Sequence, residues 1–147
     1  MISRVKIKIE SVIDNLDDAG LPAGESEKSV SLADGVYRYA GDGARISYKE
    51  SLDGGECENE ILVFSDSVTV RRHGAIISDL HFKEGESQSS VYQIPPYRFD
   101  CEVMAKRVAV DLCATGGKIN LVYNMKIGGA EKSAIMRIWI SKATNQA

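Results

Sequence analysis

Apolar and polar residues alternate with a period of two along most of this chain, and this pattern constrains its fold more than any other feature. Over residues 119–127 every second residue is apolar, and the residues between them are mostly polar. Such alternation is typical of a strand with one buried and one solvated face. The same pattern recurs at Val5, Ile7 and Ile9; at Val30 and Leu32; at Ala44, Ile46 and Tyr48; at Val68 and Val70; at Ile76, Leu80 and Phe82; at Val108, Val110 and Leu112; and at Ala134, Met136, Ile138 and Ile140.

Glycine-rich turns separate these segments. Examples are Gly41-Asp42-Gly43, Asp53-Gly54-Gly55, Gly116-Gly117 and Gly128-Gly129, whose glycines supply the positive φ angles that tight hairpins need. Because connections this short cannot contain a crossover, neighbouring strands must run antiparallel. With the less regular β-prone segments included, the sequence predicts an antiparallel meander of about eight to ten strands.

Two stretches interrupt this regularity. Asn15 to Glu25 is rich in aspartate, glycine and proline, which predicts a mobile loop after the first strand. Pro95-Pro96 is expected to end or bend a strand. A single open layer of so many strands would expose two edges and a bare apolar face, so the sheet must close into a barrel or fold into a sandwich. The alternation alone leaves both possibilities open.

Composition and charge limit the class of protein. With 147 residues, of which 44% are hydrophobic and 27% charged, the chain is expected to form one globular domain over residues 1–147. Its net charge of -3 does not favour nucleic acid as a partner. No apolar run of about 18 residues occurs, and the N-terminal segment lacks the apolar core of a secretory signal, so we expect no membrane partner. The three cysteines form no C-x-x-C pair, and their odd number favours a reducing compartment, which predicts a cytoplasmic protein.

A series of short motifs follows in a characteristic order: Asp34-Gly35-Val36-Tyr37, Ile46-Ser47-Tyr48, Arg72-His73-Gly74-Ala75-Ile76, Phe82-Lys83-Glu84-Gly85, Tyr92-Gln93-Ile94-Pro95 and Lys118-Ile119-Asn120-Leu121-Val122-Tyr123-Asn124-Met125. In this order the chain resembles, from about Val5 to Ile140, the YwiB-like proteins of bacteria, which are small calycin-type β-barrels grouped as a domain of unknown function. The resemblance implies a closed barrel related in shape to lipocalins and fatty-acid-binding proteins, and so favours a barrel over a sandwich. It implies no activity, and a small apolar ligand inside the barrel follows only by analogy of fold.

Strand parity places three polar residues inside such a barrel. Arg72 shares the parity of Val68 and Val70, and a buried guanidinium needs an anionic or carbonyl partner. Tyr48 and Tyr123 also have inward parity, and their hydroxyls need hydrogen-bond partners. Two interpretations remain open. The residues form an internal salt bridge and a packed core, or Arg72, Tyr48 and Tyr123 orient an apolar ligand that carries a carboxylate.

The sequence shows no catalytic constellation. His73 and His81 are the only histidines, both are predicted to point outward, and no cysteine or carboxylate at ligand spacing completes a metal site. Ser78 is predicted to point inward, but no histidine and acid accompany it as a triad. We therefore expect no enzyme, no metal and no cofactor.

Two functional hypotheses follow. The first is a binding module that holds a small, mostly apolar ligand in an internal cavity on the order of several hundred Å³, and a solid interior filled with side chains would refute it. The second is an interaction or assembly module, including a homodimer, that uses the outer face near Trp139 or around Arg71 and His73. Trp139 is predicted to lie outside, where it covers a neighbouring element or contacts another subunit.

Overall fold

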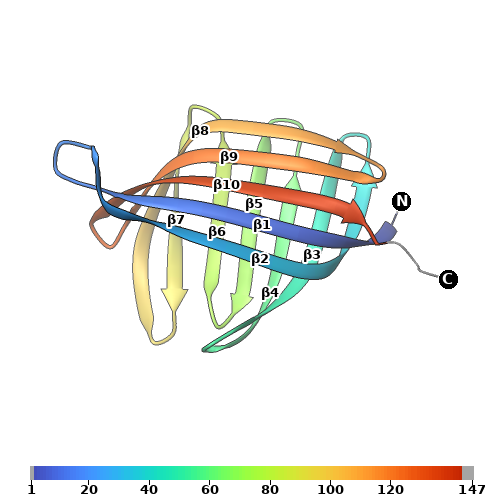
Figure 1. The fold of residues 1–147 in the computed structure, drawn as a ribbon, viewed down its shortest axis with the longest axis horizontal. Coiled ribbons are helices and arrows are strands. Elements are labelled where there is room, and N and C mark those ends of the chain that lie inside the picture. Colours follow the sequence, from blue (N-terminus) through green and yellow to red (C-terminus); the bar gives the residue numbers. More distant parts are fainter. Residues whose placement is uncertain (1, 144–147) are drawn as a thin grey trace.

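The computed structural model describes residues 2–143, and nearly all of them lie in β-strands (Figure 1). The strands close into a barrel in the order β1-β10-β9-β8-β7-β6-β5-β4-β3-β2, and every pairing is antiparallel. The predicted closed antiparallel meander is therefore confirmed. Its strands are β1 (Ile2–Leu16), β2 (Pro22–Ala40), β3 (Gly43–Leu52), β4 (Gly55–Val63), β5 (Ser67–Gly74), β6 (Ile77–Lys83), β7 (Ser87–Ile94), β8 (Tyr97–Cys113), β9 (Gly116–Ile127) and β10 (Ala130–Lys142).

The strands lie in two layers that cross at a steep angle (Figure 1). Strands β1, β2, β9 and β10 run side by side in the nearer layer, and β3 to β7 run behind them. The barrel closes where the first and last strands pair, with Ile7 opposite Ile140 and Ile9 opposite Ile138. Side chains from the inner faces of both layers therefore meet in one core.

Strand β8 belongs to both layers. At a bulge, the residues of β8 that point inward change from odd-numbered to even-numbered positions. Its register with β9 shifts between Ala105 and Arg107. Before the shift the buried residues include Cys101 and Val103, and after it Val108 lies opposite the buried Leu121. An extra residue in one strand of an antiparallel pair bends that strand and strengthens its twist, which lets β8 pass from one layer to the other.

Strand β2 pairs with β1 along most of its length but with β3 only from Gly35 to Ala40. A Cβ at Gly35 would lie 2.5 Å from the carbonyl oxygen of Ser47 and 2.6 Å from Cδ1 of Ile7. These separations are far below van der Waals contact, so only glycine allows the three strands to meet at this corner. Residues 22–34 of β2, which precede this corner, do not pair with β3, and β1 is their only ladder partner within the described chain.

The prediction of a mobile loop from Asn15 to Glu25 is wrong. Strand β1 continues to Leu16 and β2 begins at Pro22, so the connection is confined to residues 17–21. There Oδ1 of Asp17 accepts hydrogen bonds from the backbone nitrogens of Ala19 at 2.9 Å and Leu21 at 3.0 Å. The two strand ends project beyond the core, so backbone pairing rather than an apolar face holds them, and their polar composition resembles that of a loop.

The interpretation of Val30 and Leu32 as part of a buried face is also wrong. Both point to the outer surface, where Val30 is 62% and Leu32 is 77% exposed. The inner face at this point carries the small residue Ala33, which lies opposite Ile7 of β1. Because strand pairing fixes which residues share a face, the burial of Ile7 against the core determines the face of its partner strand.

The predicted turns agree better with the structure. Pro95 and Pro96 connect β7 to β8, where a strand end was expected. Gly128 and Gly129 connect β9 to β10 with φ angles of 56° and 86°, the left-handed conformation that glycine adopts most easily.

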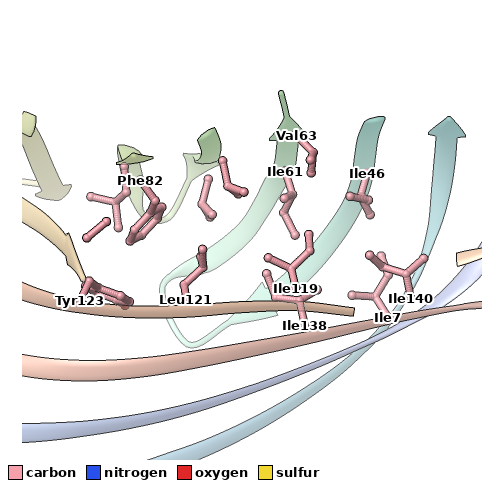
Figure 2. Close-up of a cluster of buried hydrophobic side chains, with 14 of the residues drawn as sticks. Ile7, Ile46, Ile61, Val63, Phe82, Ile119, Leu121, Tyr123, Ile138 and Ile140 are labelled. Atoms are coloured by element: carbon pink, nitrogen blue, oxygen red, sulfur yellow. The ribbon is translucent and has the colours of Figure 1, made fainter. Parts of the chain in front are cut away.

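Aliphatic side chains fill the middle of the barrel. Figure 2 shows Ile119 and Leu121 of β9 pointing toward the crossing layer, which contributes Ile46 and Ile61. All four of these residues are 0% exposed. The interior between the two layers is therefore packed, which leaves its ends as the places where polar groups can reach solvent.

Candidate functional site

Polar residues line one end of the inner wall in a continuous cross-strand row. Within it Tyr48 lies opposite Asn59, Asn59 opposite Arg72, Arg72 opposite Ser78, and Ser78 opposite Tyr92. Directly opposed residues in antiparallel strands point to the same face. These five residues of β3 to β7 are named the polar row below.

The next cross-strand row toward the middle of the barrel is entirely apolar. Ile46 lies opposite Ile61, Ile61 opposite Val70, and Val70 opposite Leu80. All four are buried, with exposures of at most 7%. The inner wall therefore changes from hydrocarbon to hydrogen-bonding groups within one step along the strands.

An acidic residue, Glu50, balances the charge of Arg72 in the polar row. The Nη2 atom of Arg72 lies 3.9 Å from Oε1 of Glu50, and the side chains are 28% and 16% exposed. Asn59, which is 1% exposed, donates from Nδ2 to the same oxygen at 3.2 Å, whereas its Oδ1 is buried without a hydrogen-bond partner within the described chain. An ion pair of this length leaves most of the five guanidinium donors free for another group.

Of the two predicted inward tyrosines, Tyr48 belongs to the polar row, and Tyr123 lies close enough to Arg72 for the guanidinium to influence its pKa. Burial raises the pKa of Tyr48 to about 12, and the nearby Arg72 guanidinium opposes this increase. Burial likewise raises the pKa of Tyr123 to about 12, again against the effect of Arg72. Within residues 2–143 neither hydroxyl makes a hydrogen bond to protein, so both phenols are neutral groups with unused donors.

Tyr123 faces the core from the opposite layer and packs against Phe82, which lies two cross-strand steps from the polar row. Its ring packs edge-on against Phe82 with the centroids 4.8 Å apart, and Figure 2 shows the two rings together at one end of the core. Tyr123 is therefore anchored by its ring while its hydroxyl is available. The structure brings Arg72, Tyr48 and Tyr123 into one neighbourhood, although its registers alone assign only the first two to the row.

A pocket of about 380 Å³ reaches the polar row where β6 and β7 separate. The ladder between these strands contains only two pairs, Ile77 with Gln93 and Ser78 with Tyr92. The pocket is lined by Arg72 and Ser78 of the row and includes neither Tyr48 nor Tyr123; its other lining residues are Glu58, Glu60, Arg71, His73, Ile77, Asp79, Ser90, Val91 and Gln93. Its volume lies within the range of about 300–1,000 Å³ that is usual for ligand sites. Apart from Arg72, Ser78 and Ser90, the lining residues have outward parity, so this space is a groove on the outer wall that meets the polar row at the junction of β6 and β7.

The outward residues singled out in the sequence lie on the outer wall. Arg71 pairs with Asp79 through Nε and Oδ2 at 3.5 Å, and Nε2 of His81 lies 3.4 Å from the other oxygen of Asp79. His73 is exposed. Trp139 is half-buried, and the Lys8 ammonium lies 5.3 Å from the centroid of its ring. A side chain of the same sheet therefore covers this tryptophan through a cation–π contact.

The sequence interpretation missed Glu50 and Asn59. Both were detectable, because Glu50 continues the parity of Ile46 and Tyr48, and Asn59 has the parity of Ile61. The charge of Glu50 and the amide of Asn59 suggested solvated strand residues, and only the register shows that they meet Arg72.

No three histidine, cysteine, aspartate or glutamate side chains gather closely enough to hold a metal ion in the described part of the chain. Between residues 2 and 143 there is likewise no helix with the length and apolarity needed to cross a membrane.

These features define a closed, ten-stranded antiparallel barrel whose inner wall becomes polar at one end. The chain belongs to the family described as a domain of unknown function (DUF1934), whose model matches residues 7–138. The resemblance inferred from the order of the motifs is thereby confirmed.

Two comparisons with individual proteins agree with this assignment. The chain is 25% identical over 128 residues to the uncharacterized beta-barrel protein YwiB of Bacillus subtilis (strain 168). These residues cover 87% of this chain and 85% of that protein. The crystal structure of ywiB protein from Bacillus subtilis is similar with a TM-score of 0.84 and 24% sequence identity, over 97% of this chain and 94% of that one. The structural likeness supports the barrel fold alone.

Proposed function

We propose that this barrel binds a small amphipathic molecule at its polar end, with the polar head group held by Arg72, Tyr48 and Tyr123. The observation that carries this proposal is the buried polar row with unused hydrogen-bonding capacity next to a pocket of about 380 Å³. A packed row with no access would have supported a purely structural role. The packed middle of the barrel argues against a ligand that runs through the whole interior.

The chemistry of the row limits the head group. Arg72 and the two phenols offer donors, while Oδ1 of Asn59 is an unpaired acceptor. Because Glu50 lies beside Arg72, the formal charges of this pair cancel. A carboxylate binds by replacing Glu50 as the partner of Arg72, and an amide or hydroxyl binds by using the donors and the acceptor together.

The route of entry follows from the separation of β6 and β7. Beyond Ser78 the two strands have no ladder pairs in the described structure, and the hydroxyl of Ser90 donates to the carbonyl oxygen of Asp79 across the gap. One side-chain hydrogen bond is more easily broken than a continuous ladder. Opening of this junction would admit the ligand beside Arg72 without unfolding the barrel.

Titration with decanoate, monitored by calorimetry, tests this proposal. We expect saturable binding by the wild-type protein and a loss of about tenfold or more in affinity for Arg72→Met, because a charge-assisted hydrogen bond is removed. Arg137→Met is the matched control, since Arg137 is an exposed arginine of β10 that lies outside the pocket and should leave affinity unchanged. Tyr123→Phe, which removes only a hydroxyl, should weaken binding without affecting the fold.

Two results would contradict this function. One is the absence of binding for decanoate, decanamide and decanol alike. The other is equal affinity in Arg72→Met and Arg137→Met, which would place the probe outside the polar row. Native mass spectrometry of the protein purified from its own host would then establish whether a small molecule accompanies it.

Assembly through the outer face is a second candidate function. The cover of Trp139 by Lys8 does not favour a contact centred on that tryptophan. A different part of the outer face, the free edge of β2, favours assembly and is considered next.

A further inference from the structure

Strand β2 has a long stretch of edge without a ladder partner among the described residues. Residues 22–34 of β2 pair with β1 on one side, and β3 occupies the other side only from Gly35 onward. An unpaired edge exposes backbone donors and acceptors that can pair with another strand. Within the described residues, the ladder between β2 and β3 is therefore missing over residues 22–34.

The centre of this edge carries exposed apolar side chains on its outer face, with no feature that prevents pairing with another strand. Val30 and Leu32 are 62% and 77% exposed and lie two residues apart on one face. Exposed edge strands are commonly protected from pairing by charges, prolines or bulges in their centre. Here the charged residues Lys28 and Asp34 stand on either side of the apolar pair instead, so the centre of the segment is open to a partner strand.

The segment Lys28–Asp34 is complementary to itself in the antiparallel direction. With Ser31 opposite Ser31 of a second copy, Val30 lies opposite Leu32 and Lys28 opposite Asp34, each pair occurring twice. Ser29 then lies opposite Ala33 on the inner face. Apolar residues thus meet apolar residues, opposite charges meet, and small residues meet small ones.

Other registers are worse. Opposed residues must share a face, so the alternatives shift the two-fold axis by one residue along the strand. An axis at Val30 places Lys28 opposite Leu32, and an axis at Leu32 places Asp34 opposite Val30. Each separates the two charges and sets a charged side chain against an apolar one, so only the axis at Ser31 satisfies the whole segment.

The charges at the ends of the segment are available for such pairing. Lys28 has no ion pair within the described chain, and Asp34 forms an exposed ion pair with Lys6 at 2.6 Å. A second lysine beside Asp34 would place its carboxylate between two ammonium groups. The partner surface therefore complements both the free cation and the exposed carboxylate.

We propose that two copies of this chain dimerise by antiparallel pairing of residues 28–34 of β2, with a two-fold axis at Ser31. The pairing continues the sheet of the nearer layer from one barrel into the other. It covers the exposed Val30 and Leu32 with their counterparts, and it does not depend on the ligand site proposed above.

Cysteine cross-linking tests the register directly. Directly opposed residues have Cα atoms about 4.5–5.5 Å apart, within the range that a disulfide can bridge. In a Cys113→Ser background, which removes the exposed thiol, Ser31→Cys should form a covalent dimer on oxidation with oxidised glutathione. Ser29→Cys is the matched control: it faces Ala33 of the partner, so its own counterpart lies too far away to be bridged. Cross-linking of both variants equally, or of neither, would overturn the proposed register.

A charge-exchange series tests the association itself by sedimentation velocity over a range of concentrations. Lys28→Asp and Asp34→Lys should each weaken dimerisation by roughly tenfold or more, because each sets like charges opposite one another twice. The double variant should restore it. Lys106→Asp on β8, four strands away in the barrel order, is the control and should dimerise like the wild type. A wild-type protein that stays monomeric, or single variants that dimerise normally, would refute the dimer.

Discussion

Individual residues of the inner wall show how a barrel can hold charge without losing its core. Arg72 of β5 is not fully buried, and its acidic partner Glu50 lies on β3, two strands away in the barrel. Partial exposure keeps the desolvation cost of the ion pair moderate, and the buried Asn59 joins the pair through Glu50. The cluster is thus tolerated by the fold while leaving donors for a ligand.

The tyrosines make stability depend on alkaline pH. Burial raises the pKa of Tyr48 and Tyr123 from 10.0 to about 12, so above pH 10 the unfolded chain loses protons that the folded protein keeps. Stability should therefore be complete below pH 10 and decrease as the pH rises through 12, by about 2–3 kcal/mol for each group. Thermal unfolding between pH 8 and 12 measures this dependence. Tyr48→Phe and Tyr123→Phe should each flatten it, and an unchanged slope in both variants would contradict the assignment.

Removal of the internal carboxylate should strengthen anion binding. Glu50→Gln leaves Arg72 without its anionic neighbour, so decanoate should bind about fivefold or more tightly, whereas decanol should gain little. Calorimetric titration of both probes distinguishes a charge effect from a general opening of the site. Equal gains for the two probes would show that Glu50 acts by occupying space.

Among the elements, β2 shows most clearly that the two halves of one strand can have different environments. Its second half lies between β1 and β3 and contributes the buried Tyr37, whose hydroxyl donates to the carbonyl oxygen of Cys113 at 2.8 Å. Its first half has a single neighbour and remains exposed. The change occurs at Gly35, where the absence of a side chain lets β3 approach.

The corner at Gly35 should therefore be intolerant of any side chain. Gly35→Ala places a methyl group against the backbone of Ser47, and we expect a loss of about 1–3 kcal/mol in the free energy of unfolding. Gly41→Ala is the control, because a Cβ there meets nothing within 4 Å. Urea denaturation of both variants provides the comparison, and equal stability would show that the strands at the corner can move apart.

At the scale of the whole molecule, closure of the first strand on the last joins the barrel into a single core. Ile138 of β10 is 0% exposed and lies opposite Ile9 of β1, next to the pair formed by Ile7 and Ile140. This seam lies between the two ends of the chain. Its packing therefore couples residues that are distant in sequence.

Truncation at this seam should destabilise the entire protein. Ile138→Ala should lower the free energy of unfolding by about 2–5 kcal/mol while keeping one cooperative transition. Ile2→Ala removes the same atoms from a side chain that is 59% exposed, and its effect should stay within about 0.5 kcal/mol. Denaturant unfolding followed by both fluorescence and circular dichroism tests this. Separate transitions in the two signals would indicate that the seam opens on its own.

The sequence by itself determined the class of fold and the inward position of Arg72, Tyr48 and Tyr123. Period-two alternation and glycine turns are local properties that predict an antiparallel meander, and the order of the motifs, by its resemblance to a family, favoured closure into a barrel. Parity relative to neighbouring valines was sufficient to orient Arg72, because β5 has no bulge between Val68 and that residue.

Only the tertiary structure decided which residues meet and which segments have no partner. The row of Asn59, Arg72 and Ser78 depends on the register between strands, and the residues next to each of them in sequence do not determine that register. The extension of β1 and β2 through the expected loop, and the outward position of Val30 and Leu32, depend on a backbone ladder and on the burial of Ile7 across it. Pairing energy between distant strands, rather than local preference, thus fixed both the polar end of the barrel and the free edge of β2.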